Sequence, residues 1–183
     1  SIYRELSLDE KIGQLFFVQA TAKKINNSKN ILTEITSNKI GGLIFSTGNP
    51  TIQVNLTNKY QKISKTPLLI STDGEWGVGM RLDSVLKFPW NMSLGAIKND
   101  LILEEIGKEI GDQFNRLGIH MNFAPVVDIN TNSNNPIIGN RSYGESKINV
   151  SSKGINFTRG IQSKNILATA KHFPGHGDTS KDS

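Results

Sequence analysis

The stretch ILATAKHFPGHGDTSKDS, residues 166–183, begins as a short apolar strand and ends as a polar loop. The strand covers Ile166 to Ala170, and Lys171 and His172 follow it directly. The loop after them carries two glycines, a second histidine and two aspartates. Glycines let such a loop bend, and a dense group of titratable side chains at a strand end is typical of a functional site. The stretch therefore predicts chemistry at the carboxyl end of a buried strand.

Two earlier strands end in the same way. Residues 68–70 are apolar and run into Asp73, and residues 119–123 run into Asp128. A (β/α) barrel builds its active site from the loops at the carboxyl ends of several strands, whereas an open α/β sheet binds mainly at one switch point. Three successive strand ends with polar residues favour the barrel. No G-x-G-x-x-G follows the first strand, which counts against a dinucleotide-binding sheet.

Helical patterns alternate with these strands, which predicts an α/β protein with a parallel sheet. The apolar runs predict strands near residues 15–19, 43–46, 68–72, 120–124 and 166–171. The amphipathic segments predict helices over residues 28–39, 51–64, 100–117 and 150–161, with a further helix start at Ser7. A full (β/α)8 TIM-type barrel takes about 250 residues. The fold we expect is such a barrel, of which this chain covers roughly the first five βα units.

The composition argues against several classes of protein. Lysine and arginine total 21 and aspartate and glutamate 16, but the basic residues are scattered and form no stripe with aromatic residues. We therefore expect no nucleic-acid partner. No apolar run approaches the ~20 residues of a membrane span, so no membrane partner is expected either. Cysteine is absent, which removes disulfides, thiol catalysis and cysteine-bound metal but leaves the compartment open.

The terminal loop resembles a known family. Lys171 to Thr179 read Lys-His-Phe-Pro-Gly-His-Gly-Asp-Thr, and Asp182-Ser183 follow after two other residues. This pattern resembles glycoside hydrolase family 3, in its bacterial β-N-acetylglucosaminidase branch, where the motif continues Asp-Ser-His. The chain matches each fixed position through Ser183 and stops before that histidine. The resemblance implies that residues 1–183 are the N-terminal portion of a single family 3 catalytic barrel.

Other motifs agree with the resemblance. Asp73 and Arg81 keep the eight-residue spacing of the family's sugar-binding loop, although Trp76–Met80 replace its usual Gly-Gly-Arg-Val core. Residues 122–128 match the fourth-strand motif, and residues 139–144 match the loop whose arginine contacts the sugar. The substrate-binding residues implied by the resemblance are Asp73, Arg81, Arg141, Lys171 and His172. Their carboxylate, guanidinium, ammonium and imidazole groups are suited to sugar hydroxyls.

The resemblance also implies a mechanism. Asp182 is the catalytic residue, as the aspartate of an Asp–His acid/base pair whose histidine would follow Ser183. The nucleophile, an aspartate after the seventh strand, lies beyond the chain, so the fragment alone is expected to be inactive. Asp128 and His176 are candidates for support of the loop and site. Asp128 either caps a helix or pairs with Arg141, and His176 either organises the loop or donates a proton. No metal or cofactor is implied.

The function implied for the intact protein is that of a retaining exo-glycosidase. It would hydrolyse terminal β-N-acetylglucosaminides through a covalent glycosyl-enzyme, with a carbohydrate and the C-terminal remainder of the same barrel as its partners. The alternatives are a β-glucosidase of the same family, an inactive half-barrel that at most binds sugar, and a silent scaffold. The resemblance does not fix the location of the protein. It leaves the bacterial cytoplasm or, if a leader was removed, the periplasm or the exterior of the cell.

Overall fold

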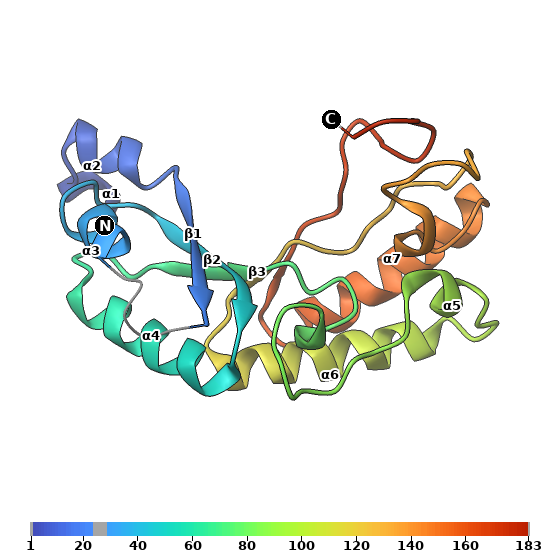
Figure 1. Cartoon of the computed structure of the whole chain (residues 1–183), viewed down its shortest axis with the longest axis horizontal. Helices are drawn as coiled ribbons and strands as arrows, with labels where there is room; N and C mark the ends of the chain where they lie inside the picture. Colours follow the sequence, from blue (N-terminus) through green and yellow to red (C-terminus); the bar gives the residue numbers. More distant parts are fainter. Residues whose placement is uncertain (1, 24–28, 183) are drawn as a thin grey trace.

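A computed structural model describes residues 2–23 and 29–182. Its centre is a five-stranded parallel sheet in the order β1-β2-β3-β4-β5, so the strands follow one another in space as they do in the chain (Figure 1). The strands are β1 Phe17–Ala22, β2 Gly42–Gly48, β3 Leu69–Thr72, β4 Met121–Asn122 and β5 Leu167–Ala168. Parallel neighbours in sequence order, joined by helical crossovers, are the pattern of a TIM-type barrel. The predicted α/β barrel class is confirmed, and the described residues contain five parallel strands with helices after the first four of them.

Helices precede and connect these strands. They are α1 Ile2–Glu5, α2 Leu8–Gly13, α3 Lys29–Thr36, α4 Pro50–Ile63, α5 Asn91–Gly95, α6 Leu101–Leu117 and α7 Lys147–Gln162, with 3-10 turns η1 Val78–Met80 and η2 Gly139–Arg141. Helices α6 and α7 run side by side (Figure 1) and cross at Gly160, where an added Cβ would lie 2.1 Å from the carbonyl oxygen of Glu104. Only glycine permits this approach of the two backbones. No helix within residues 2–23 and 29–182 is both long and apolar enough to span a membrane.

The helix signals in the sequence are mostly confirmed. Gly118 ends α6 in the left-handed conformation, with φ 66°. Ser7 caps α2 as predicted: its hydroxyl accepts the N–H of Glu10, and the Glu10 carboxylate accepts the N–H of Ser7. The predicted helix over residues 28–39 corresponds to α3, although Ser28 lies outside the described residues. The short helix α5 was not predicted.

Loss of the Ser7 cap is expected to be measurable in the complete protein. Ser7→Ala removes the acceptor for the first turn of α2, which should lower the free energy of unfolding by about 1 kcal/mol. Chemical denaturation of wild type and variant measures this difference. Ser37→Ala, at an exposed serine beyond the end of α3, is the matched control and should change stability by less than about 0.5 kcal/mol. Equal effects of the two substitutions would contradict the capping role.

Three predicted strands differ in extent from those observed. The first was expected at residues 15–19 but begins at Phe17, because the N–H groups of Leu15 and Phe16 donate to Ile12 and Gly13 in a turn after α2. The fourth and fifth are shorter than expected. Pro125 has no N–H to donate, so their ladder stops and resumes as a single bridge between Val126 and Lys171.

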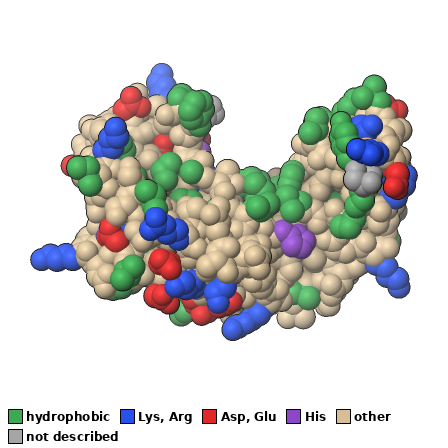
Figure 2. Space-filling model, turned by 180° about the vertical axis from the view of Figure 1, so that it is seen from behind, with side chains coloured by type: hydrophobic (Ala, Val, Ile, Leu, Met, Phe, Trp, Pro, Cys, Tyr) green, Lys and Arg blue, Asp and Glu red, His purple; other side chains and the backbone are tan. Residues whose placement is uncertain are grey.

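The core has a large and a small part. The large part lies between the sheet and its helices and includes Leu43, Ile70 and Phe114, all essentially without solvent exposure. The small part holds the loops beyond the sheet in place. It consists of Leu94, Leu103, Tyr143 and Val150, which come from α5, α6, the loop after η2, and α7. Tyr143 thereby fixes the polypeptide next to Arg141. Figure 2 shows the molecule hollowed between two arms.

Candidate active site

Asp73 follows β3 and joins two of the predicted site residues. Its Oδ1 lies 2.9 Å from Lys171 Nζ, and its Oδ2 lies 2.7 Å from Arg81 Nη2. Lys171 follows β5, so this carboxylate links loops that are 98 residues apart in the chain. Asn122 at the end of β4 fixes the backbone after Asp73, because its side-chain amide exchanges two hydrogen bonds with Gly74. The ends of β3, β4 and β5 therefore meet at one edge of the sheet.

Glu75 forms the second carboxylate of this cluster. Arg141 donates from Nη2 to Oε1 at 2.7 Å and from Nε to Oε2 at 2.9 Å, which is a bidentate pair. Lys171 Nζ lies 2.8 Å from the same Oε1. The backbone of Arg141 is held separately, since the Asn91 side chain in α5 donates to its carbonyl oxygen at 2.8 Å. Sequence reasoning gave no role to Glu75 or Asn91.

The ion pairs in this cluster keep both carboxylates charged. Burial by itself would raise the pKa of Asp73, but the positive charges of Lys171 and Arg81 and their hydrogen bonds outweigh it and lower that pKa. The pKa of Glu75 is lowered in the same way, with burial opposed by Arg141 and Lys171. The pKa of Arg141 is raised, chiefly by its hydrogen bonds to Glu75. These shifts favour the charged forms of both carboxylates and of Arg141.

The lowered pKa of Asp73 predicts a pH dependence of stability. Because the folded-state pKa lies below the ordinary value of 3.8, the stabilisation is complete above that value. It is lost as the pH falls through the lower, folded-state pKa. We expect Asp73→Asn to destabilise the complete protein at pH 7 and to cost less as the pH approaches 3, measured by denaturation at each pH. A cost that grows on acidification would contradict the assignment.

Asp128 holds the start of the terminal loop. Its side chain is fully buried, and its Oδ2 lies 2.6 Å from His172 Nδ1 and accepts the backbone N–H of His172 at 3.2 Å. Its Oδ1 accepts the backbone N–H of His176 at 2.7 Å. The sequence left open two roles for Asp128, a helix cap and an ion pair with Arg141. In the structure its carboxylate instead contacts His172 and the backbone of His176. The physical reason is that the loop after β5 folds back over the end of β4.

The remainder of the terminal loop rests on an asparagine-rich segment. Asn135 donates from its side chain to the carbonyl oxygen of His176 at 2.7 Å, and Asn132 donates to that of Thr179 at 3.2 Å. The Nε2 atom of His176 lies 3.8 Å from Asp182 Oδ1, with the Asp182 side chain 73% exposed. The segment that leads to Asp182 is therefore held at two of its backbone carbonyl groups, those of His176 and Thr179.

The structure brings most of the predicted site residues together. Asp73, Arg81, Arg141 and Lys171 form one network, and His172 follows Lys171 in the chain. Asp182 lies beside His176 rather than in that network. Within the described residues no group of three or more histidine, aspartate or glutamate side chains is arranged to hold a metal. A pocket of about 610 Å³ lies at this edge, and its lining includes Asp128, His172 and Asp178.

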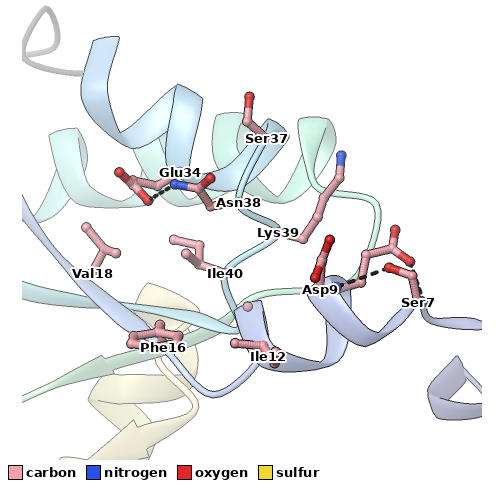
Figure 3. A pocket seen from close by; sticks show the side chains of 12 residues that line it. Ser7, Asp9, Ile12, Phe16, Val18, Glu34, Ser37, Asn38, Lys39 and Ile40 are labelled. Carbon is pink, nitrogen blue, oxygen red and sulfur yellow. Dashed lines mark hydrogen bonds between the residues drawn. The ribbon is translucent and has the colours of Figure 1, made fainter.

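A second pocket, of about 800 Å³, lies away from these residues (Figure 3). Four apolar side chains line it. Ile12 is in α2, Phe16 in the turn after α2, Val18 in β1, and Ile40 in the connection from α3 to β2. Glu34 and Asn38 line it as well and share a hydrogen bond. This pocket lies at the amino ends of β1 and β2, a face that serves stability in barrel enzymes. The candidate active site therefore remains at the opposite, carboxyl ends of the strands.

Comparison with known proteins identifies the family of the chain. The sequence model described as "Glycosyl hydrolase family 3 N terminal domain" matches residues 7–183. The chain belongs to glycoside hydrolase family 3. The predicted resemblance to this family is confirmed, and the family's N-terminal domain accounts for nearly the whole chain.

Relatives within family 3 agree on the class of protein. The chain is 39% identical over 166 residues to Beta-hexosaminidase A of Pseudoalteromonas piscicida, covering 83% of this chain and 28% of the relative. It is 31% identical to the Beta-N-acetylglucosaminidase/beta-glucosidase of Cellulomonas fimi, covering 97% and 31%. A solved family 3 beta-N-acetylglucosaminidase from Paenibacillus sp. str. FPU-7 superposes with a TM-score of 0.89 at 40% identity, covering 97% of this chain and 35% of that one. The chain spans about a third of the length of these relatives.

Proposed function

We propose that the complete protein is a retaining β-N-acetylglucosaminidase, and that residues 1–183 are the N-terminal portion of its catalytic barrel. The observation that carries this proposal is the charged network at the carboxyl ends of β3, β4 and β5, which unites Asp73, Arg141 and Lys171. It is supported by two relatives whose names contain hexosaminidase or N-acetylglucosaminidase, and by the solved family 3 enzyme.

The network is suited to holding a sugar ring. Asp73 is 24% exposed at its side chain, so its oxygens can accept hydrogen bonds from neighbouring hydroxyls while Lys171 and Arg81 keep it ionised. Lys171, His172 and Arg141 would supply donors. Charge-assisted hydrogen bonds of this kind are stronger and more directional than neutral ones. Each of these donors is paired with a carboxylate, which holds it in place for the sugar.

The acid/base step would fall to the terminal loop. In a retaining mechanism a nucleophile attacks the anomeric carbon, the glycosidic C–O bond breaks, and an acid gives its proton to the leaving oxygen. The same group then takes a proton from the water that hydrolyses the glycosyl-enzyme. We assign Asp182 to this step as the carboxylate that orients and charges an imidazole, and we expect the nucleophile after the seventh strand of the complete barrel. Asp182 is exposed and lies on a loop with two glycines, so it can approach the sugar.

A β-glucosidase is the second candidate, because the name of the Cellulomonas fimi relative includes both activities. The Gly-His-Gly-Asp-Thr loop favours the N-acetylglucosaminidase. The test compares kcat/KM of the complete protein for nitrophenyl β-N-acetylglucosaminide and nitrophenyl β-glucoside, with proton NMR of the first anomer released. The proposal expects preference for the acetylated sugar and a β product. A preference for glucoside selects the second candidate, and an α product excludes a retaining mechanism.

A further inference from the structure

Glu75 is the most deeply buried member of the charged cluster. Its side chain has no solvent exposure, whereas those of Asp73, Arg141 and Lys171 are 24%, 23% and 15% exposed. Glu75 therefore lies beneath the groups that a sugar would touch. Its two oxygens are occupied by Arg141 and by Lys171, which come from the loops after β4 and β5. One carboxylate from the loop after β3 thus joins all three loops.

Two simpler roles fit Glu75 less well. A general acid must reach the substrate and hold a proton near neutral pH, which usually requires a raised pKa. Glu75 has no exposed atom, and its pKa is lowered because Arg141 and Lys171 outweigh the effect of burial. A purely structural ion pair is also a poor description. Burying a carboxylate is costly, and apolar residues of similar size commonly stabilise a fold as well or better.

We propose that Glu75 is a positioning residue for sugar recognition, which acts by fixing Arg141 and Lys171; this inference rests on the function proposed above. The bidentate pair holds the planar guanidinium of Arg141 in one orientation, and Oε1 holds the Lys171 ammonium between Glu75 and Asp73. Long cationic side chains otherwise lose conformational freedom when a ligand binds. With Glu75 in place, that loss occurs on folding rather than on binding.

The two protein segments beside Glu75 support this role. Asn122 secures the loop at Gly74, directly before Glu75, and Asn91 secures the backbone of Arg141. The acceptor and the donor of the bidentate pair are therefore both fixed through their own backbones by buried asparagines. A group that merely neutralised charge would need no such control of its direction. This arrangement is what a preorganised binding site requires.

Glu75→Gln in the complete enzyme tests the inference. Glutamine keeps the size of the side chain but has one acceptor oxygen, and its NH2 would face a cation. We expect KM for a nitrophenyl glycoside to rise about 10–100-fold, as expected for loss of preorganised charge-assisted contacts, with kcat within about 3-fold of wild type. Glu105→Gln is the matched control, because Glu105 pairs with Lys108 on α6 and its side chain is 71% exposed, and it should change neither constant.

Arg141→Lys provides a second variant that leaves Glu75 paired with a cation and so protects the fold. Lysine cannot form the bidentate pair, and KM should rise as it does in Glu75→Gln. Adding Glu75→Gln to Arg141→Lys should then raise KM by less than Glu75→Gln does alone, because the bidentate pair is already lost and only the contact of Glu75 with Lys171 remains to be removed. Fully multiplicative effects would overturn the proposal. So would a lowered kcat at unchanged KM, which indicates a smaller folded fraction.

Failure of the inference is distinguishable from failure of the proposed function. If the wild-type protein prefers β-glucosides, the proposed function is wrong, and the KM comparison is made on the glucoside instead. An unchanged KM in Glu75→Gln on the preferred glycoside overturns the positioning role whichever sugar that is.

Discussion

Replacing Asp182 with alanine in the complete enzyme is expected to lower kcat by about 10²–10⁴-fold on N-acetylglucosaminides with unactivated leaving groups, the range typical of acid/base catalysis. A carboxylate that orients and charges an imidazole acts in proton transfer more than in sugar binding. The loss should be smaller for nitrophenyl glycosides, because a phenolate leaves with little protonation. Steady-state kinetics on both substrate types, at the glycosylation step, measure the difference.

The controls for this experiment come from the same chain. Lys181→Ala changes an exposed charged side chain of the same loop, outside the lining of the pocket, and should leave kcat near the wild-type value. Asp73→Ala and Arg141→Ala should harm both substrate types alike, because we propose that those groups hold the sugar whichever group leaves it. If Asp182→Ala loses equally on both substrates, the acid/base assignment fails and Asp182 is a structural loop residue.

His176 offers a sharper discrimination, because its Nε2 lies 3.8 Å from the Asp182 carboxylate. The imidazole of the proposed pair is instead the histidine expected after Ser183. His176→Ala should therefore affect activated and unactivated substrates to the same extent, through disorder of the loop. If His176→Ala shows the selective loss predicted for Asp182→Ala, the proton carrier is His176 itself.

The features predicted correctly from the sequence are those that depend on neighbouring residues. The apolar run before Asp73, the cap at Ser7 and the stop at Gly118 are each encoded within a few positions. The first strand was misplaced because Leu15 and Phe16 are apolar but remain exposed, at 80% and 58%. Hydrophobicity alone does not show that a turn after α2 delays the start of pairing until Phe17.

The partners of the buried carboxylates could not be predicted in this way. Glu75 meets Arg141 across 66 positions, and Asp128 meets His172 across 44. Such pairs are set by which barrel loops fold over one another, and no local spacing encodes that. The one available signal was position, because both carboxylates lie just beyond strand ends. That signal identifies the edge of the sheet but does not match each acid with its partner.

Asp128→Asn is expected to lower kcat/KM by about 10²-fold on activated and unactivated substrates alike. The buried carboxylate accepts from the His172 ring and from the N–H groups of His172 and His176. Hydrogen bonds to a charged group contribute about 1.5–3 kcal/mol each, and 1.4 kcal/mol corresponds to a tenfold change. Asparagine keeps the shape but turns an NH2 group toward donors, so at least one of these bonds is lost and His172 is no longer oriented.

The loss for Asp128→Asn is expected to be general, because Asp128 contacts both His172, which we propose binds the sugar, and the start of the loop that carries Asp182. Asp112→Asn is the matched control, since Asp112 pairs with Lys164 at the surface and exposed pairs contribute at most about 1 kcal/mol. Kinetics and denaturation of the two variants are compared in the complete enzyme. A loss confined to unactivated substrates would show that Asp128 acts only through the acid/base loop. Wild-type kinetics would show that the three hydrogen bonds to Asp128 do not position the site.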